Sequence, residues 1–155
     1  MKRLPSSILL IGGLASVSVN ADTLIPPDPW EIIHVARTLG SAEVGRDAMK
    51  DPRIVGEVLQ LTYSVDFYGC WLGRACETIM FRARLMKNDW KPRSKAIASW
   101  NAEKLFGRAW RDGEGVAVLD HAVSMRAGLP EDTLLASFEA WRRALLEFAD
   151  HVDFQ

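Results

Sequence analysis

Two cysteines, Cys70 and Cys76, are the only thiols in this chain of 155 residues. A cysteine pair can form a structural disulfide, or it can exchange disulfides with other proteins. Redox sites favour two intervening residues at a helix start, where the helix dipole lowers the pKa of a thiol. Here five residues intervene, and the pair falls between two expected strands whose ends must come close. The spacing and context therefore predict a structural bridge.

A loop closed by this bridge contains Trp71 and Arg74. Tryptophan is enriched among the residues that anchor protein interfaces, and arginine makes charge-assisted hydrogen bonds to carboxylates. The loop is therefore a candidate contact for a partner protein. The sequence leaves two simpler alternatives open, in which Trp71 folds back onto a neighbouring element and Arg74 is a solvated loop residue.

A second group of residues that could do chemistry surrounds the expected exit of a helix into a strand. Asn101 or Arg108 could organise a polar pocket lined by Trp100 and Trp110, which would suit a small molecule or a cell-wall fragment. No nucleophile with a nearby base accompanies them, so no catalytic residue is assigned. A structural interpretation is favoured, with Trp100 in the core, Asn101 bonding to backbone and Gly107 allowing close approach.

The histidines are scattered along the chain, at positions 34, 121 and 151. Glu147 and His151 lie four residues apart near Asp150 and Asp153, so a divalent metal is conceivable there. Charged residues at a helix end are normally solvated, and neither a metal nor another cofactor is predicted. His121 alternates with apolar residues and is expected to face the interior or a sheet edge.

The first residues resemble an export signal. Lys2 and Arg3 precede an apolar run, Ile8 to Val19, and small residues end the segment at Ala21. The run is about 12 residues long, whereas a membrane-spanning helix needs roughly 20. We therefore expect a cleaved signal peptide over residues 1–21, a short lead without regular structure over 22–27 and one domain over 28–155.

Export predicts a periplasmic or secreted protein without stable membrane insertion, in a compartment where disulfides persist. No cysteine lies directly after the expected cleavage at Ala21, so lipid attachment is not expected. Loss of Lys2 and Arg3 reduces 19 basic residues to 17 against 20 acidic ones, a formal charge of −3. This balance and the absence of a basic cluster disfavour nucleic-acid binding.

The remaining sequence alternates between helical and strand periodicity. A helix is expected from the Asp28 cap to Leu39, and two weak strands should meet at a turn at Asp51-Pro52, with Gly56 as a bulge or second turn. Clearer strands span 62–68 and 78–85, followed by a helix over 94–104 and a hairpin of strands over 107–112 and 116–125.

The last helix, from Pro130, has the strongest pattern in the chain. Its apolar residues recur at steps of three and four and form one continuous stripe: Leu134, Phe138, Trp141, Leu145, Phe148 and Val152. Such a stripe must lie on a hydrophobic surface. The order of elements predicts an α+β fold in which helices flank an antiparallel sheet.

Three segments resemble the YbjN domain family of bacterial sensory transduction regulators. They are Phe67-Tyr68-Gly69-Cys70 with Cys76, the stretch 98–108 that contains Trp100, Asn101, Phe106, Gly107 and Arg108, and the terminal 138–154 with Trp141 and Phe148. The resemblance implies a fold similar to the type III secretion chaperones, no established catalytic reaction and regulatory or protein-binding roles. It also implies dimerisation.

The leading hypothesis is therefore an exported, non-catalytic domain that engages another protein. The alternative is a protein that binds or hydrolyses a small molecule or cell-wall fragment through Asn101, Arg108 and Trp110. Fold resemblance alone is weak evidence about function.

Overall fold

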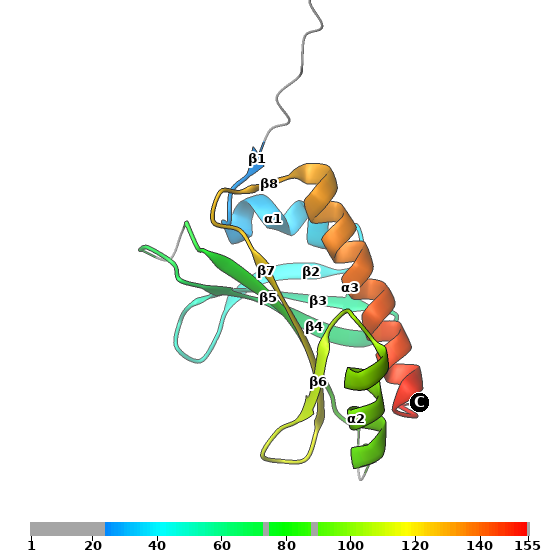
Figure 1. The fold of residues 1–155 in the computed structure, drawn as a ribbon. Helices are drawn as coiled ribbons and strands as arrows, with labels where there is room; N and C mark the ends of the chain where they lie inside the picture. The colour runs from blue at the N-terminus through cyan, green and yellow to red at the C-terminus, as the bar shows by residue number, and fades with distance from the viewer. Residues whose placement is uncertain (1–23, 73–74, 88–89, 155) are drawn as a thin grey trace, which may run out of the picture.

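The computed structural model describes residues 24–72, 75–87 and 90–154. Within these ranges, three helices lie on one side of a six-stranded antiparallel sheet, which confirms the predicted α+β class (Figure 1). In chain order the elements are β1 (Leu24–Ile25), α1 (Pro29–Ala36), β2 (Ala42–Arg46), β3 (Pro52–Val58), β4 (Leu61–Tyr68), β5 (Thr78–Leu85), α2 (Ser94–Glu103), β6 (Arg108–Arg111), β7 (Ala117–Ser124), β8 (Leu129–Pro130) and α3 (Glu131–His151).

The strands of the large sheet lie in the order β2-β3-β4-β5-β7-β6. The central strand β5 pairs with β4 on one side and β7 on the other, so that Phe81 lies opposite Val65 and His121. Side chains alternate between the two faces of a strand. The predicted apolar set of β5, including Phe81, therefore faces the helices, and Met80, Arg82 and Arg84 face the opposite, helix-free side, called the open face below.

The stripe on α3 covers the centre of this sheet. Phe138 and Trp141 are fully buried. Their rings lie 4.8 Å and 5.4 Å, between centroids, from the ring of Phe81. Trp100 of α2 adds an edge-to-face contact with Phe148, at 5.1 Å. The amphipathic pattern of the sequence thus becomes one aromatic core between α3, α2 and the sheet.

Two local predictions are wrong. Gly56 forms neither a bulge nor a turn but lies inside β3, where a Cβ atom would sit 2.5 Å from the Tyr63 ring. The chain turns instead at Leu59 and Gln60, which both have positive φ. The lead is not wholly irregular either, because Leu24–Ile25 pairs with β8 and buries Ile25.

Other boundaries differ less. The first helix ends at Ala36, and Leu39 follows it in a turn. The signal segment 1–21 and Arg74 lie outside the described residues. None of the described helices combines the length and apolar character needed to cross a membrane.

Candidate functional site

The tip of the β4–β5 hairpin is closed by a disulfide between Cys70 and Cys76. Cys76 is buried, and its backbone N–H donates to the carbonyl of Pro27 over 3.3 Å. The bridge therefore holds the hairpin tip against the segment that leads into α1. This restricts the loop that carries Trp71.

Two large apolar side chains of this loop face solvent. Trp71 is 75% exposed and Leu72 is 83% exposed. Leu72 also has a positive φ of 51°, an uncommon conformation for a branched residue. The alternative in which Trp71 folds back onto a neighbouring element is therefore not what the structure shows, since the side chain lies at the surface.

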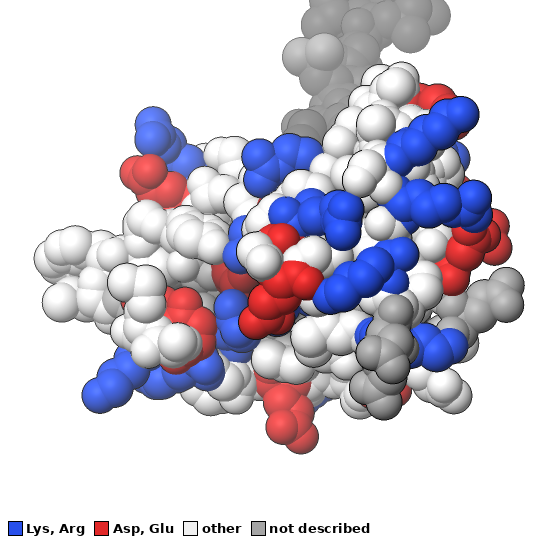
Figure 2. Space-filling view, turned by 90° about the horizontal axis from the view of Figure 1, so that it is seen from below, with Lys and Arg blue, Asp and Glu red and all other residues white. Residues whose placement is uncertain are grey.

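Leu72 lines a groove with a volume of about 370 Å³. The groove, called the hairpin groove below, is built by the α1 start, the β2–β3 edge and the hairpin tip: Pro29, Trp30, Val44, Gly45, Arg46, Pro52 and Leu72. Trp30 is 64% exposed. Figure 2 shows an uncharged projection at the left, the side on which the β4–β5 hairpin projects in Figure 1.

Trp30 owes its place to the start of α1. The carboxylate of Asp28 accepts the backbone N–H of Trp30 over 2.9 Å, and Pro29 occupies the first helical turn. In the sequence these residues indicated only the start of a helix, and no role was predicted for Trp30. One feature of the sequence could have indicated that Trp30 is exposed. It is a large aromatic residue that lies outside the buried stripe formed by Ile32, Val35 and Ala36.

The region of Trp100 and Asn101 has a different character. The indole N–H of buried Trp100 donates to the carbonyl of Gly107 over 3.1 Å. The side-chain amide of Asn101 donates to the carbonyl of Ala109 (2.8 Å), and its oxygen accepts the N–H of the same residue (2.9 Å). Both polar groups of Asn101 thus hold the exit from α2 into β6.

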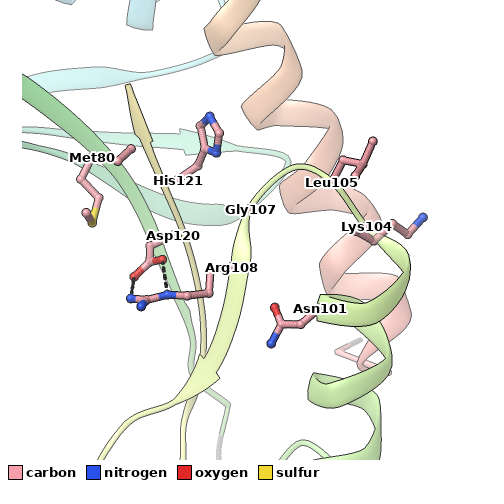
Figure 3. Close-up of a pocket in the computed structure, with 9 residues that line it drawn as sticks. Met80, Asn101, Lys104, Leu105, Gly107, Arg108, Asp120 and His121 are labelled. Atoms are coloured by element: carbon pink, nitrogen blue, oxygen red, sulfur yellow. Dashed lines mark hydrogen bonds and ion pairs between the residues drawn. The ribbon is translucent and has the colours of Figure 1, made fainter. Parts of the chain in front are cut away.

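Arg108 and Trp110 converge on Asp120. The guanidinium of Arg108 donates through Nε and Nη2 over 3.2 Å and 3.1 Å, and the Trp110 indole N–H donates over 3.0 Å. The hydrogen bonds to Asp120 raise the pKa of Arg108 above its ordinary value. Figure 3 shows this pair beside a hollow of about 730 Å³ that Asn101 also lines.

That hollow offers little for catalysis. Both polar groups of Asn101 already have partners in Ala109, and Nε and Nη2 of Arg108 have partners in Asp120. His121, on its rim, stacks on Phe106 with ring centroids 3.7 Å apart. Burial lowers the pKa of His121, and the Asp120 charge opposes this only in part. The imidazole of His121 is therefore neutral near pH 7, and its stacking on Phe106 holds it in place.

Asp120 also belongs to a line of alternating charges across the open face. Arg53 bonds Asp66, Arg82 lies 3.7 Å from both Asp66 and Asp120, and Arg108 completes the line. Both aspartates are only 4% exposed. Figure 2, seen from below, shows basic and acidic side chains interleaved. The sequence analysis did not identify either aspartate.

The other histidines contact neighbouring helices. His34 lies 3.3 Å from Glu131. His151 Nε2 lies 3.0 Å from both the Ser99 hydroxyl and the Ala96 carbonyl. A carbonyl oxygen can only accept a hydrogen bond, so this nitrogen must carry the proton that it donates. That geometry ties α3 to α2 and does not activate Ser99. No cluster of three His, Cys, Asp or Glu side chains suited to a metal occurs within the described residues.

Fold and surface together define a small chaperone-like α+β domain with a surface groove lined by the exposed side chains of Trp30 and Leu72. A crystal structure of the Yersinia pestis type III secretion chaperone SycH, in complex with a stable fragment of YscM2, has a similar fold with a TM-score of 0.50 and 13% sequence identity. The likeness covers 78% of this chain and 96% of the chaperone chain. At this identity it shows the fold alone.

The sequence profile described as "YbjN: Putative bacterial sensory transduction regulator" matches residues 29–154. The chain therefore belongs to the YbjN family, as the three sequence segments predicted. No curated protein matches the sequence.

Proposed function

We propose that this YbjN domain is exported to the bacterial cell envelope and binds another protein there without catalysing a reaction. The observation that carries the proposal is the exposure of Trp30 and Leu72 on one groove, with exposed Trp71 next to Leu72 in the disulfide-closed loop. Exposed aromatic side chains on a restrained loop lose little conformational entropy on binding and can anchor an interface.

The hairpin groove suits a protein segment better than a small ligand. Residues of the edge strand β2, among them Val44 and Arg46, line it together with Trp30 and Leu72, so a bound segment could contact both strand backbone and exposed apolar side chains. The SycH structure, which has the same fold, contains a bound protein fragment. The homodimer implied by the family resemblance stays a prediction, which sedimentation of the purified protein would test.

Site-specific photocrosslinking in the native organism tests the contact surface. A benzophenone amino acid replaces Leu72 in one variant and Leu59, which is 75% exposed, in the control. Leu59 precedes β4 and the hairpin tip follows it, so the two probes lie at opposite ends of one strand. We expect one defined protein adduct from position 72 and none from position 59. Identical adducts from both positions, or none from position 72, would contradict the proposal.

Cell fractionation tests export separately. A mature chain that begins at Asp22 and is released with the periplasm or medium is the expected product, identified by its mass. An uncleaved chain that remains in the cytoplasm would overturn the export proposal and leave the binding surface to be judged on the crosslinks.

A further inference from the structure

Strand β7 is twice as long as the strand that covers its outer side. All eight residues of β7 pair with β5, from Ala117 to Ser124. Only the first four pair with β6, whose last match is Arg108 with Asp120. Among the described residues, no strand pairs with the outer side of residues 121–124. We call this segment the β7 edge.

The direction of the backbone groups on the β7 edge follows from two hydrogen bonds. Met125 N–H donates to Glu77 on the β5 side, and Asp112 N–H donates to Val116 on the β6 side. In an antiparallel ladder the bonding side alternates from residue to residue. Ala122 and Ser124 therefore direct their N–H and C=O groups outward, to the side where β6 has ended.

The opposite edge of the sheet is better protected. The corresponding outward carbonyl of Ala42, on β2, accepts the Arg37 guanidinium Nε over 3.2 Å. Helix α1, which precedes β2, also packs beside this strand. Proteins commonly cover or charge such edges to prevent unwanted pairing. The β7 edge has no equivalent cover among the described residues.

Gly107 explains why β6 stops. Its φ is +82°, and a Cβ there would lie 2.9 Å from a Leu119 methyl carbon. The chain turns toward α2 at this point, as Figure 3 shows. The space left in line with β6 is the hollow described above, lined by Lys104, Leu105, Arg108 and Ala122 among others.

We infer that the β7 edge accepts an extended segment of a partner protein as an added strand in line with β6. A strand is the occupant because paired outward N–H and C=O groups, spaced two residues apart, match another β backbone. Its side chains would alternate between the helix-covered side, beside Leu105 and Phe106, and the open face, beside Arg108. An apolar residue fits the first position and an acidic residue the second. The inference rests on the proposed function in taking the partner to be a protein.

Random nonapeptides displayed on phage are the probe for this edge. They are selected on the purified protein, and the winning sequence is synthesised. We expect an alternating apolar and acidic pattern, and at least tenfold slower amide exchange at Ala122 and Ser124 when the peptide is bound. In the free protein both amides should exchange rapidly. Slow exchange without peptide, or failure to select any peptide, would overturn the inference.

A matched pair of variants isolates the outward N–H. Ala122→Pro removes it at a position where a proline is tolerated, because that side faces none of the described strands. Ala122→Val keeps it and adds a side chain of similar bulk. We expect binding to be lost in Ala122→Pro and kept in Ala122→Val. Equal peptide affinities for the two would overturn the inference. Trp71→Ala should leave this binding unchanged, so failure here is distinct from failure at the hairpin groove.

Discussion

Asp120 shows how a single buried carboxylate organises one side of the sheet. It accepts hydrogen bonds from Arg108 and Trp110 and faces Arg82 across the open face. An aspartate that is 4% exposed needs such partners, since an unpaired buried charge is costly. Because Asp120 accepts these hydrogen bonds, its carboxylate is held in the structure and is not free to act as an acid or base.

Replacement of Asp120 by asparagine keeps the shape but removes the charge. We expect the unfolding free energy to fall by about 1–3 kcal/mol, because charge-assisted bonds become neutral ones and the arginines lose their counter-ion. Urea denaturation measures this. Asp153→Asn, at an exposed pair with Arg93, is the control and should change stability by less than about 0.5 kcal/mol. Equal effects would contradict the role assigned to Asp120.

His121 should make the native state sensitive to acid. Burial holds its pKa below the ordinary value in the folded protein, whereas in the unfolded chain it titrates near pH 6.5. As the pH falls below about 6.5, the unfolded state binds the proton first, so native stability falls until folded His121 also protonates. His121→Phe keeps the stack on Phe106. The loss of unfolding free energy between pH 7.5 and pH 5.5 should be smaller in this variant, and an equal loss would argue against burial as the cause.

At the scale of elements, the β4–β5 hairpin is the part that the sequence predicted most usefully. Alternation identified both strands, and the cysteine spacing indicated the bridge at their junction. The same reasoning could not place Trp30 beside Leu72, because the two are distant in the chain and meet only when α1 packs against the edge of the sheet.

Removal of the bridge should destabilise the hairpin. With serine at both Cys70 and Cys76, we expect the unfolding free energy to fall by about 2 kcal/mol, since the unfolded chain is no longer restricted by the closed loop. Chemical denaturation with and without dithiothreitol measures it. Reductant should lower the midpoint of the wild-type protein and leave the double-serine variant unchanged. An unchanged wild-type midpoint would refute the prediction.

Alanine substitutions at two glycines on neighbouring strands distinguish the effect of side-chain packing on stability from the effect of backbone freedom. Gly56→Ala brings a methyl group against the buried Tyr63 ring, where its Cβ would lie 2.5 Å away. We expect a loss of about 1–3 kcal/mol from overpacking. At Gly45 an added Cβ meets nothing within 4 Å, so Gly45→Ala should be neutral or slightly stabilising. Thermal unfolding compares the two, and similar melting temperatures would contradict the packing argument.

Local sequence patterns predicted most of the fold. The features that they did not predict depend on contacts between residues far apart in the chain. The stripe on α3 and the alternation in β4 and β5 arise from neighbouring residues, so their periods predict them. Burial of Asp66 and Asp120 depends on arginines from other strands. The length of β6 depends on how Gly107 meets Leu119. Neither relation leaves a periodic signal in the sequence.

Across the whole molecule, the layered fold separates its surfaces by chemistry. The helices and one face of the sheet enclose the aromatic core, and the open face carries charges that largely neutralise one another. Two of the exposed large apolar side chains, Trp30 and Leu72, line the hairpin groove, and Trp71 precedes Leu72 on the same loop. The proposed partner contact at the hairpin groove therefore lies apart from the broad charged face.

The most direct measurement of this account is the affinity of the crosslinked partner for three forms of the protein. These are the wild type, the double variant Trp30→Ala and Trp71→Ala, and Leu59→Ala as the control. Because all three replaced side chains are exposed, each form should fold. We predict that the double variant binds at least tenfold more weakly and that Leu59→Ala binds as the wild type does. Equal affinities for the wild type and the double variant would contradict a binding surface at the hairpin groove.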